Sequence, residues 1–117
     1  MSSDFVVNIT ESSNSAVGTI ALQGELDEFS LDMLKEKADA TLHNAGTKLI
    51  IFDLKDLEFI NSKGIGFFVS VHTHLTKDGR RLALVGAKEP VMDVISLVGL
   101  TSIIPYYDTI EEAMGNV

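Results

Sequence analysis

Apolar residues recur along this chain with two different periods, which predicts that strands and helices alternate. Segments rich in β-branched and aromatic residues, bounded by glycine, serine or asparagine, are typical of strands. They are Phe5–Thr10, Val17–Gln23, Leu49–Phe52, Arg81–Gly86 and Ser102–Pro105. The first two, with a turn cluster at 12–15 between them, predict an antiparallel hairpin, and the continuous apolar run Leu49–Phe52 predicts a central strand buried on both faces. The last strand contains a proline, which cannot donate to a ladder, so we expect it at an edge of the sheet.

The remaining segments have the period of amphipathic helices. These helices are expected at about Ser30–Asn44, from Ser62 to about Lys77, from Pro90 to Val98, and from about Asp108 to Met114. Their apolar faces are expected at Leu31, Leu34, Ala38, Thr41 and Leu42, then at Ile65, Phe68, Val69 and Leu75, then at Val91, Val94, Ile95 and Val98, and finally at Ile110, Ala113 and Met114. Asp108 and Glu111 have the spacing of a capping box for the last helix.

The order of these elements, β-β-α-β-α-β-α-β-α, predicts an α/β fold. We expect one domain over residues 1–117, with a core at about 5–114. Right-handed crossovers would join about five strands into a mixed β-sheet, with about four helices packed against it.

The junction of the central strand with the second helix is the most informative stretch. Its sequence, Asn61-Ser62-Lys63-Gly64-Ile65-Gly66, places the Ser62 hydroxyl at the expected N-cap and two glycines in the first turns. A glycine inside a helix costs about 1 kcal/mol relative to alanine. Free N–H groups at a helix start favour a negative group by about 0.3–1 kcal/mol, and phosphorylation of Ser62 would supply one. The residues alone leave a second interpretation open, in which Ser62 is an ordinary cap beside glycines that allow close packing.

Candidate site residues are expected at one edge of the sheet, because sites in open α/β sheets gather at the carboxyl ends of the parallel strands. The segment Asp53–Ile60 is expected to be a loop. Asp27, this loop, Ser62 and Gly86–Pro90 should all lie near that edge.

Four acidic residues near this edge have two interpretations. They are Asp27, Asp53, Asp56 and Glu58. Their oxygens could hold a hard cation. The chain has no D-x-D-x-D-G loop, so a solvated acidic rim is the favoured interpretation.

The composition excludes several function classes. A net charge of −8 and a pI near 4.6 argue against binding to nucleic acid or to an anionic membrane surface, both of which need clustered basic residues. The chain has no cysteine, so disulfide and thiolate chemistry are excluded. It also lacks an apolar run of about 18 residues or a signal-like start. We therefore expect a cytoplasmic protein.

Enzymatic chemistry has little support in the sequence. A nucleophilic Ser62 would need a base within hydrogen-bond reach, yet the histidines are His43, His72 and His74. His72 and His74 fall two and a half turns or more along the helix that Ser62 begins, too far to reach its hydroxyl. They are also two residues apart, so they do not share the helix face that a metal site would need. The glycines do not form a phosphate-binding loop of nucleotide-binding type. No catalytic residue, metal or cofactor is expected.

Two apolar residues of the second helix, Phe67 and Val71, lie off its expected core stripe. One interpretation places them in the core of a helix squeezed between two layers. The other makes them a docking patch beside Ser62, with Gly64 and Gly66 allowing a partner to approach closely.

Three segments carry a resemblance to a known family. They are GELD at Gly24–Asp27, DLKDLEFINSKGIG ending at Gly66, and LVGL at Leu97–Leu100. In this order they resemble the STAS domain of bacterial anti-sigma factor antagonists, and the match covers roughly Phe5 to Met114.

The resemblance implies a regulatory function and a role for particular residues. In that family the serine at the start of this helix is phosphorylated by a partner kinase, and the matching residue is Ser62. Asn61 stands where the family usually has aspartate, and Lys63 stands where it usually has serine or threonine. Asp27, Asp56 and Glu58 would form the rim that the kinase recognises.

The resemblance also implies the partners and the direction of the switch. The unphosphorylated protein would bind an anti-sigma factor serine kinase and free the sigma factor, and phosphorylation would release the kinase until a serine phosphatase removes the phosphate. Added charge on an acidic surface predicts the same direction. The alternative is a STAS-like scaffold of a signalling assembly, never phosphorylated, in which Ser62 only caps the helix.

Overall fold

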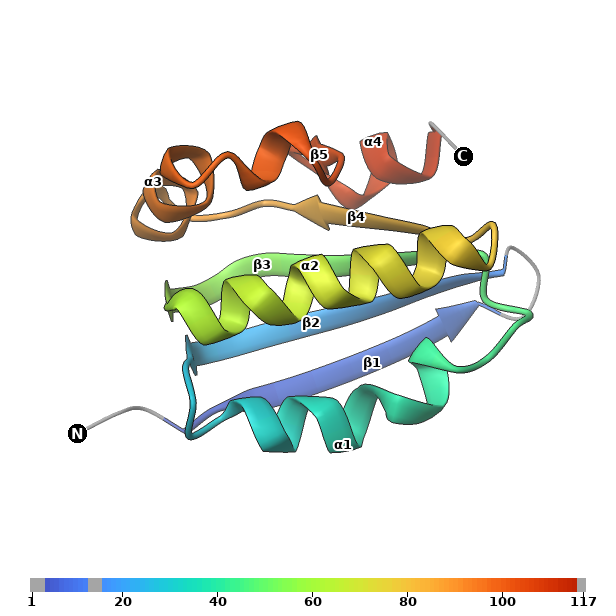
Figure 1. Ribbon diagram of the computed structural model, residues 1–117, viewed down its shortest axis with the longest axis horizontal. Coiled ribbons are helices and arrows are strands. Elements are labelled where there is room, and N and C mark those ends of the chain that lie inside the picture. Colours follow the sequence, from blue (N-terminus) through green and yellow to red (C-terminus); the bar gives the residue numbers. More distant parts are fainter. Residues whose placement is uncertain (1–3, 13–15, 116–117) are drawn as a thin grey trace.

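The strands form a single mixed sheet whose spatial order follows the chain (Figure 1). The structure, a computed structural model, describes residues 4–12 and 16–115. The strands are β1 Val6–Ser12, β2 Val17–Leu26, β3 Leu49–Ile60, β4 Arg81–Val85 and β5 Tyr106–Tyr107. β1 pairs antiparallel with β2, and every later neighbour pairs in parallel. The expected α/β class, hairpin and mixed sheet are therefore confirmed, while the turn residues 13–15 lie outside the described residues.

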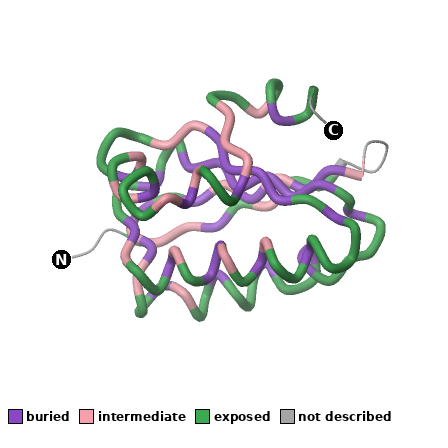
Figure 2. Tube along the Cα trace, turned by 45° about the horizontal axis from the view of Figure 1, so that its top comes forward, coloured by how far each residue is buried: buried purple, intermediate pink, exposed green. Residues whose placement is uncertain are grey.

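Helices cover the two faces of the sheet unequally. The helices are α1 Leu31–Leu42, α2 Ser62–Lys77, α3 Glu89–Leu97 and α4 Ile110–Gly115, with a 3-10 turn at Leu100–Ser102. α1 and α2 lie side by side on one face, where the larger hydrophobic cluster forms. A smaller cluster on the other face includes Ala113 of α4. Figure 2 shows the buried positions concentrated in the strands and along the inner sides of the helices.

Alternation along β3 explains the two clusters. Ile50 and Phe52 point to the larger cluster, whereas Leu49 and Ile51 point to the smaller one. Because successive side chains of a strand face opposite sides, a strand that is apolar at every position must be covered on both. The central strand predicted from Leu49–Phe52 is thus confirmed.

The expected loop at Asp53–Ile60 is wrong, because β3 continues as a strand to Ile60 and pairs with β2 as far as Leu26. Two register shifts interrupt this pairing. Such irregularities add residues to one strand and break strict alternation. The buried side chains Leu54 and Leu57 therefore do not follow a period of two, and the sequence pattern resembled that of a loop.

The C-terminal elements begin later than expected. The predicted strand at Ser102–Pro105 is replaced by the 3-10 turn and by β5, the edge strand beside β4. The capping box also shifts by one residue. Thr109 Oγ1 accepts from the Glu112 backbone N–H at 3.1 Å, and Glu112 Oε1 accepts from the Thr109 N–H at 3.2 Å.

Several helix faces also differ from expectation, including that of α4, where Met114 is 40% exposed. Val98 was expected on the core face of α3, but it follows the last helical residue and is 53% exposed. On α2 the buried positions are Gly64, Phe67, Phe68, Val71 and Leu75. Ile65 and Val69, which were expected in the core stripe, are only partly buried.

A buried arginine ties the end of the molecule where α1 and α2 finish. Arg80 is 4% exposed. Its guanidinium donates to the backbone carbonyls of Thr47 at 2.8 Å, Leu42 at 2.7 Å and Thr41 at 3.3 Å. The side chain therefore joins the turn after α2 to the end of α1 and to the segment that leads into β3.

Candidate functional site

Ser62 is the first residue of α2, and its side chain is exposed at the end of the molecule where β2 and β3 finish (Figure 1). The expectation that Ser62 caps the helix is wrong. The cap is Asn61, whose Oδ1 accepts from the backbone N–H groups of Lys63 at 3.0 Å and Gly64 at 3.2 Å. Across residues 4–12 and 16–115, no hydrogen bond engages the Ser62 hydroxyl. The hydroxyl is thus exposed at the positive end of the helix. It makes no hydrogen bond to a described residue that would stabilise the helix start.

Asn61 also connects this helix start to the turn after β2. Its Nδ2 donates to Glu28 Oε1 at 2.8 Å, and its backbone N–H donates to the Leu26 carbonyl at 3.2 Å. An aspartate at this position could accept from the helix but could not donate to Glu28. The asparagine therefore holds together two segments that lie far apart in the sequence.

Asp27 stabilises the turn that leads into α1. Its Oδ1 accepts from the backbone N–H groups of Phe29 at 2.9 Å and Ser30 at 3.1 Å. Ser30 Oγ in turn donates to the Glu25 carbonyl at 2.7 Å. Asp27 lies at the same end as Ser62, as expected, but one of its oxygens is engaged in this turn.

The two glycines of α2 lie in different surroundings. Gly64 is buried against the sheet, and a Cβ there would lie 2.8 Å from Ile60 Cγ1 and 2.9 Å from Leu26 Cγ. Gly66 is exposed, and a Cβ there would meet nothing within 4 Å. Close packing inside the molecule therefore accounts for Gly64, whereas only Gly66 leaves bare backbone on the surface.

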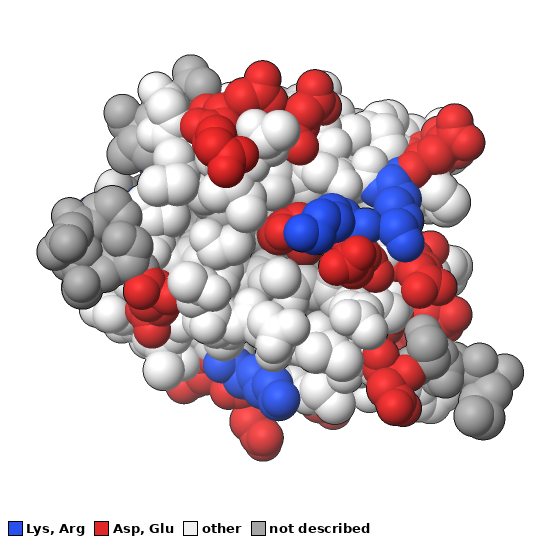
Figure 3. Space-filling view, turned by 180° about the vertical axis from the view of Figure 1, so that it is seen from behind, with Lys and Arg blue, Asp and Glu red and all other residues white. Residues whose placement is uncertain are grey.

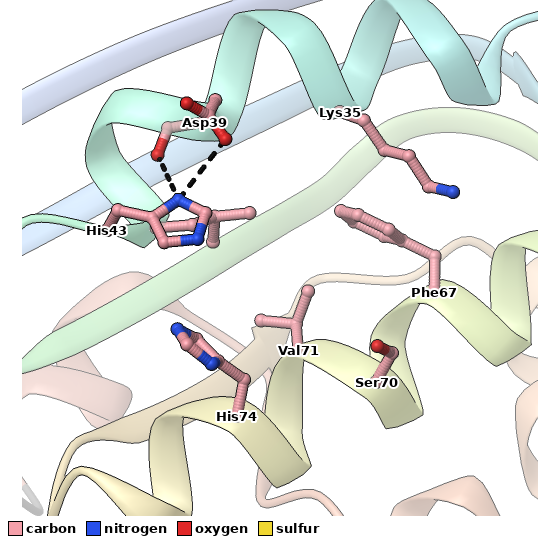
Figure 4. Close-up of a pocket in the computed structure, with 8 residues that line it drawn as sticks. Lys35, Asp39, His43, Phe67, Ser70, Val71 and His74 are labelled. Atoms are coloured by element: carbon pink, nitrogen blue, oxygen red, sulfur yellow. Dashed lines mark hydrogen bonds and ion pairs between the residues drawn. The ribbon is translucent and has the colours of Figure 1, made fainter.

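Phe67 and Val71 belong to the core, 7% and 6% exposed. The Phe67 ring packs edge-on against Phe52, with the ring centroids 6.1 Å apart. Of the two interpretations of these residues, the core position describes them in this structure. Both also line a shallow groove of about 340 Å³ between α1 and α2, where Lys35 and Ser70 stand at the rim (Figure 4).

The acidic residues are divided between two places. Asp56 and Glu58 are exposed on β3, and the basic Lys63 is exposed on α2. Asp53 is instead buried, accepts from the Lys55 backbone N–H at 3.1 Å and lies beside Gly86. Because β3 runs on past Asp53 to Ile60, the expected single edge is wrong, and Gly86 lies with Asp53 rather than with Ser62. On the face opposite α1 and α2, acidic side chains gather at several places around the border (Figure 3).

Within the described ranges, no three histidine or acidic side chains are close enough together to hold a metal ion. His43 and His74 meet at the far end of the groove with ring centroids 5.3 Å apart, and Asp39 accepts from His43 Nδ1 (Figure 4). His72 is ten residues along α2 from Ser62, a rise of about 15 Å. It therefore cannot act as a base for the Ser62 hydroxyl.

None of the described helices is both long and apolar enough to span a lipid bilayer.

The glutamate at the turn and the aromatic residue after it were not singled out from the sequence. Glu28 forms the hydrogen bond to Asn61, and Phe29 beside it is 87% exposed. The available indication was an aromatic residue in a polar connection between a strand and a helix. Which partner Glu28 would meet could not be known before β2 and β3 were placed side by side.

Comparison with known proteins identifies the family. The family model of the STAS domain matches residues 8–113. The anti-sigma F factor antagonist of Paenibacillus polymyxa is 29% identical over 89 residues, which cover 76% of each chain. The anti-sigma-B factor antagonist of Bacillus subtilis (strain 168) is 31% identical over 98 residues, covering 84% of this chain and 88% of the relative.

A solved structure has the same fold. The crystal structure of an anti-sigma factor antagonist from Mycobacterium paratuberculosis superposes with a TM-score of 0.86 at 21% identity, covering 97% of this chain and 94% of that one. The chain is thus a small α/β domain with the fold of that protein. It belongs to the STAS domain family, and the resemblance noted in its sequence is confirmed.

Proposed function

We propose that this protein is an anti-sigma factor antagonist whose binding is switched by phosphorylation of Ser62. In its unphosphorylated form it binds a kinase-type anti-sigma factor, which then releases its sigma factor. A serine phosphatase restores this form after phosphorylation. The protein acts in the cytoplasm by binding its partner and catalyses no reaction of its own.

The observation that carries this proposal is the position of the Ser62 hydroxyl. It is exposed, and Asn61 rather than Ser62 caps the helix. A kinase can therefore transfer a phosphoryl group to this oxygen without breaking a hydrogen bond that the fold needs. The relatives that this chain matches are themselves anti-sigma factor antagonists.

Charge gives the direction of the switch. A phosphate adds about −1.5 to −2 charge, next to Asn61 and the Glu28 carboxylate that Asn61 binds. The whole chain already carries −8. A kinase that holds a nucleotide brings the nucleotide's own phosphates up to the Ser62 hydroxyl, so a phosphate on Ser62 would meet like charge at close range, and mismatched charge across an interface can cost several kcal/mol.

The test compares variants of Ser62 in binding to the purified anti-sigma factor kinase of the same organism, with ADP present so that no phosphoryl transfer occurs. Ser62→Ala should bind as wild type, and Ser62→Asp should bind about tenfold more weakly or worse, about 1.4 kcal/mol per tenfold. Ser70→Asp is the matched control, because it adds the same charge to an exposed serine of α2, about 12 Å further along the helix. Equal affinity of Ser62→Asp and wild type would contradict the switch.

Mass spectrometry of the tryptic peptide from Asp56 to Lys63, from protein isolated from its own cells in growth and in stress, tests the modification itself. Phosphate on Ser62 that varies with condition supports the switch. A well-detected peptide without phosphate in any condition would favour the unphosphorylated scaffold of a signalling assembly.

A further inference from the structure

We propose that Phe29 is the apolar anchor through which the anti-sigma factor holds the unphosphorylated protein. This inference rests on the proposed function and assigns the docking surface, which consists of Phe29 and Met33 with the carboxylates around them. Phe29 is 87% exposed and Met33 is 41% exposed. Phe29 and Met33 line the same hollow, and contiguous exposed apolar side chains with polar residues around them mark interaction sites.

The turn that carries Phe29 is held by several hydrogen bonds. Asp27 Oδ1 accepts from the Phe29 backbone N–H at 2.9 Å, and Ser30 Oγ binds the Glu25 carbonyl at 2.7 Å and accepts from the Asp27 N–H at 3.0 Å. Ser30 itself is buried. An aromatic ring held by a fixed backbone loses little conformational freedom on binding, which is why such residues are frequent at interface hot spots.

The turn is joined directly to the site of phosphorylation. Glu28, the residue before Phe29, accepts from Asn61 Nδ2 at 2.8 Å, and Asn61 is followed by Ser62. We therefore expect a partner seated on Phe29 to extend to the Ser62 hydroxyl. In this arrangement Phe29 provides the binding affinity, and phosphorylation of the neighbouring Ser62 ends the binding.

The charges around Phe29 define the partner. A hollow of about 200 Å³ beside the ring is lined by Asp4, Glu25 and Asp27 together with the apolar Phe5 and Met33. None of the described residues that line the hollow is basic. The surface thus fits a partner with an apolar pocket rimmed by arginine or lysine. A second copy of this chain is a poor occupant, because it would bring the same carboxylates face to face.

The test is titration calorimetry with the purified anti-sigma factor kinase of the same organism and ADP. Phe29→Ala should lower the affinity about tenfold or more, as expected for an aromatic hot spot, without lowering the melting temperature. Leu97→Ala is the matched control, because Leu97 is also 87% exposed but ends α3. It should bind as wild type.

A charge reversal tests the nature of the partner independently. Glu25→Lys should weaken binding and reduce its dependence on salt, whereas Glu111→Lys, the same change on α4, should leave both unchanged. Binding of wild type with undiminished binding of Phe29→Ala would overturn the anchor and leave the proposed function standing. Equal losses in Phe29→Ala and Leu97→Ala would likewise overturn the assignment to this turn. Failure of wild type and Ser62→Ala to bind at all would overturn both proposals.

Discussion

At the scale of single residues, the helix cap and the proposed phosphorylation site are two adjacent residues, Asn61 and Ser62, which the sequence alone did not distinguish. Both residue types are good N-caps, and they are adjacent. The structure assigns the cap to Asn61, because β3 continues to Ile60 and the helix begins directly at Ser62. The stability of α2 therefore depends on Asn61, whereas the proposed regulation by phosphorylation depends on Ser62.

This division predicts different losses of stability. Asn61→Ala should lower the free energy of unfolding by about 0.5–2 kcal/mol, the usual cost of losing a cap. Ser62→Ala, an exposed change outside the cap, should stay within about 0.5 kcal/mol of wild type. Urea denaturation followed by circular dichroism measures both. Equal losses for the two variants would mean that the Ser62 hydroxyl contributes to the cap after all.

At the scale of the elements, α2 is set against the sheet by the small size of Gly64. A Cβ at that position would lie 2.8 Å from an Ile60 side-chain carbon. Gly64→Ala should therefore destabilise the protein by about 1–3 kcal/mol, the usual cost of overpacking. Gly66→Ala meets open space and should stabilise it by up to about 1 kcal/mol through helix propensity. Thermal or urea unfolding of the pair checks this, and a stabilised Gly64→Ala would show that the helix shifts freely on the sheet.

The same elements show how far the sequence could predict the fold. The alternation of strands and helices, the central strand and the buried face of α1 at Leu34, Ala38, Thr41 and Leu42 were all accessible from periodicity. The second half of β3 was not, because its register shifts oppose Gln23 to Asp56 and Glu25 to Phe59, and no local pattern records a partner strand. For the candidate site, Ser62 could be predicted from the sequence because glycines follow it at the start of a helix. The hydrogen bond from Asn61 to Glu28 joins residues 33 apart in the sequence, so it could be recognised only in the folded structure.

At the scale of the whole molecule, Arg80 closes the end remote from Ser62. Its three donors satisfy carbonyls up to 39 residues away in sequence. Arg80→Met should lower the free energy of unfolding by at least about 2 kcal/mol, because buried carbonyls lose charged donors. Arg80→Lys should recover only part, since an ammonium cannot reproduce the planar fork. Urea denaturation measures both, with Lys77→Met at the exposed end of α2 as control. A loss as small as that of Lys77→Met would contradict this role.

The separation of these two ends has a consequence for how the protein can change over evolution or by engineering. α2 is 16 residues long, so its two ends are about 24 Å apart. Stabilising changes often cost activity when the site and the stabilising contacts share residues. Here the hydrogen bonds of Arg80 can be strengthened or weakened without contact with Phe29 or Ser62. Thermal stability and partner specificity can therefore change independently.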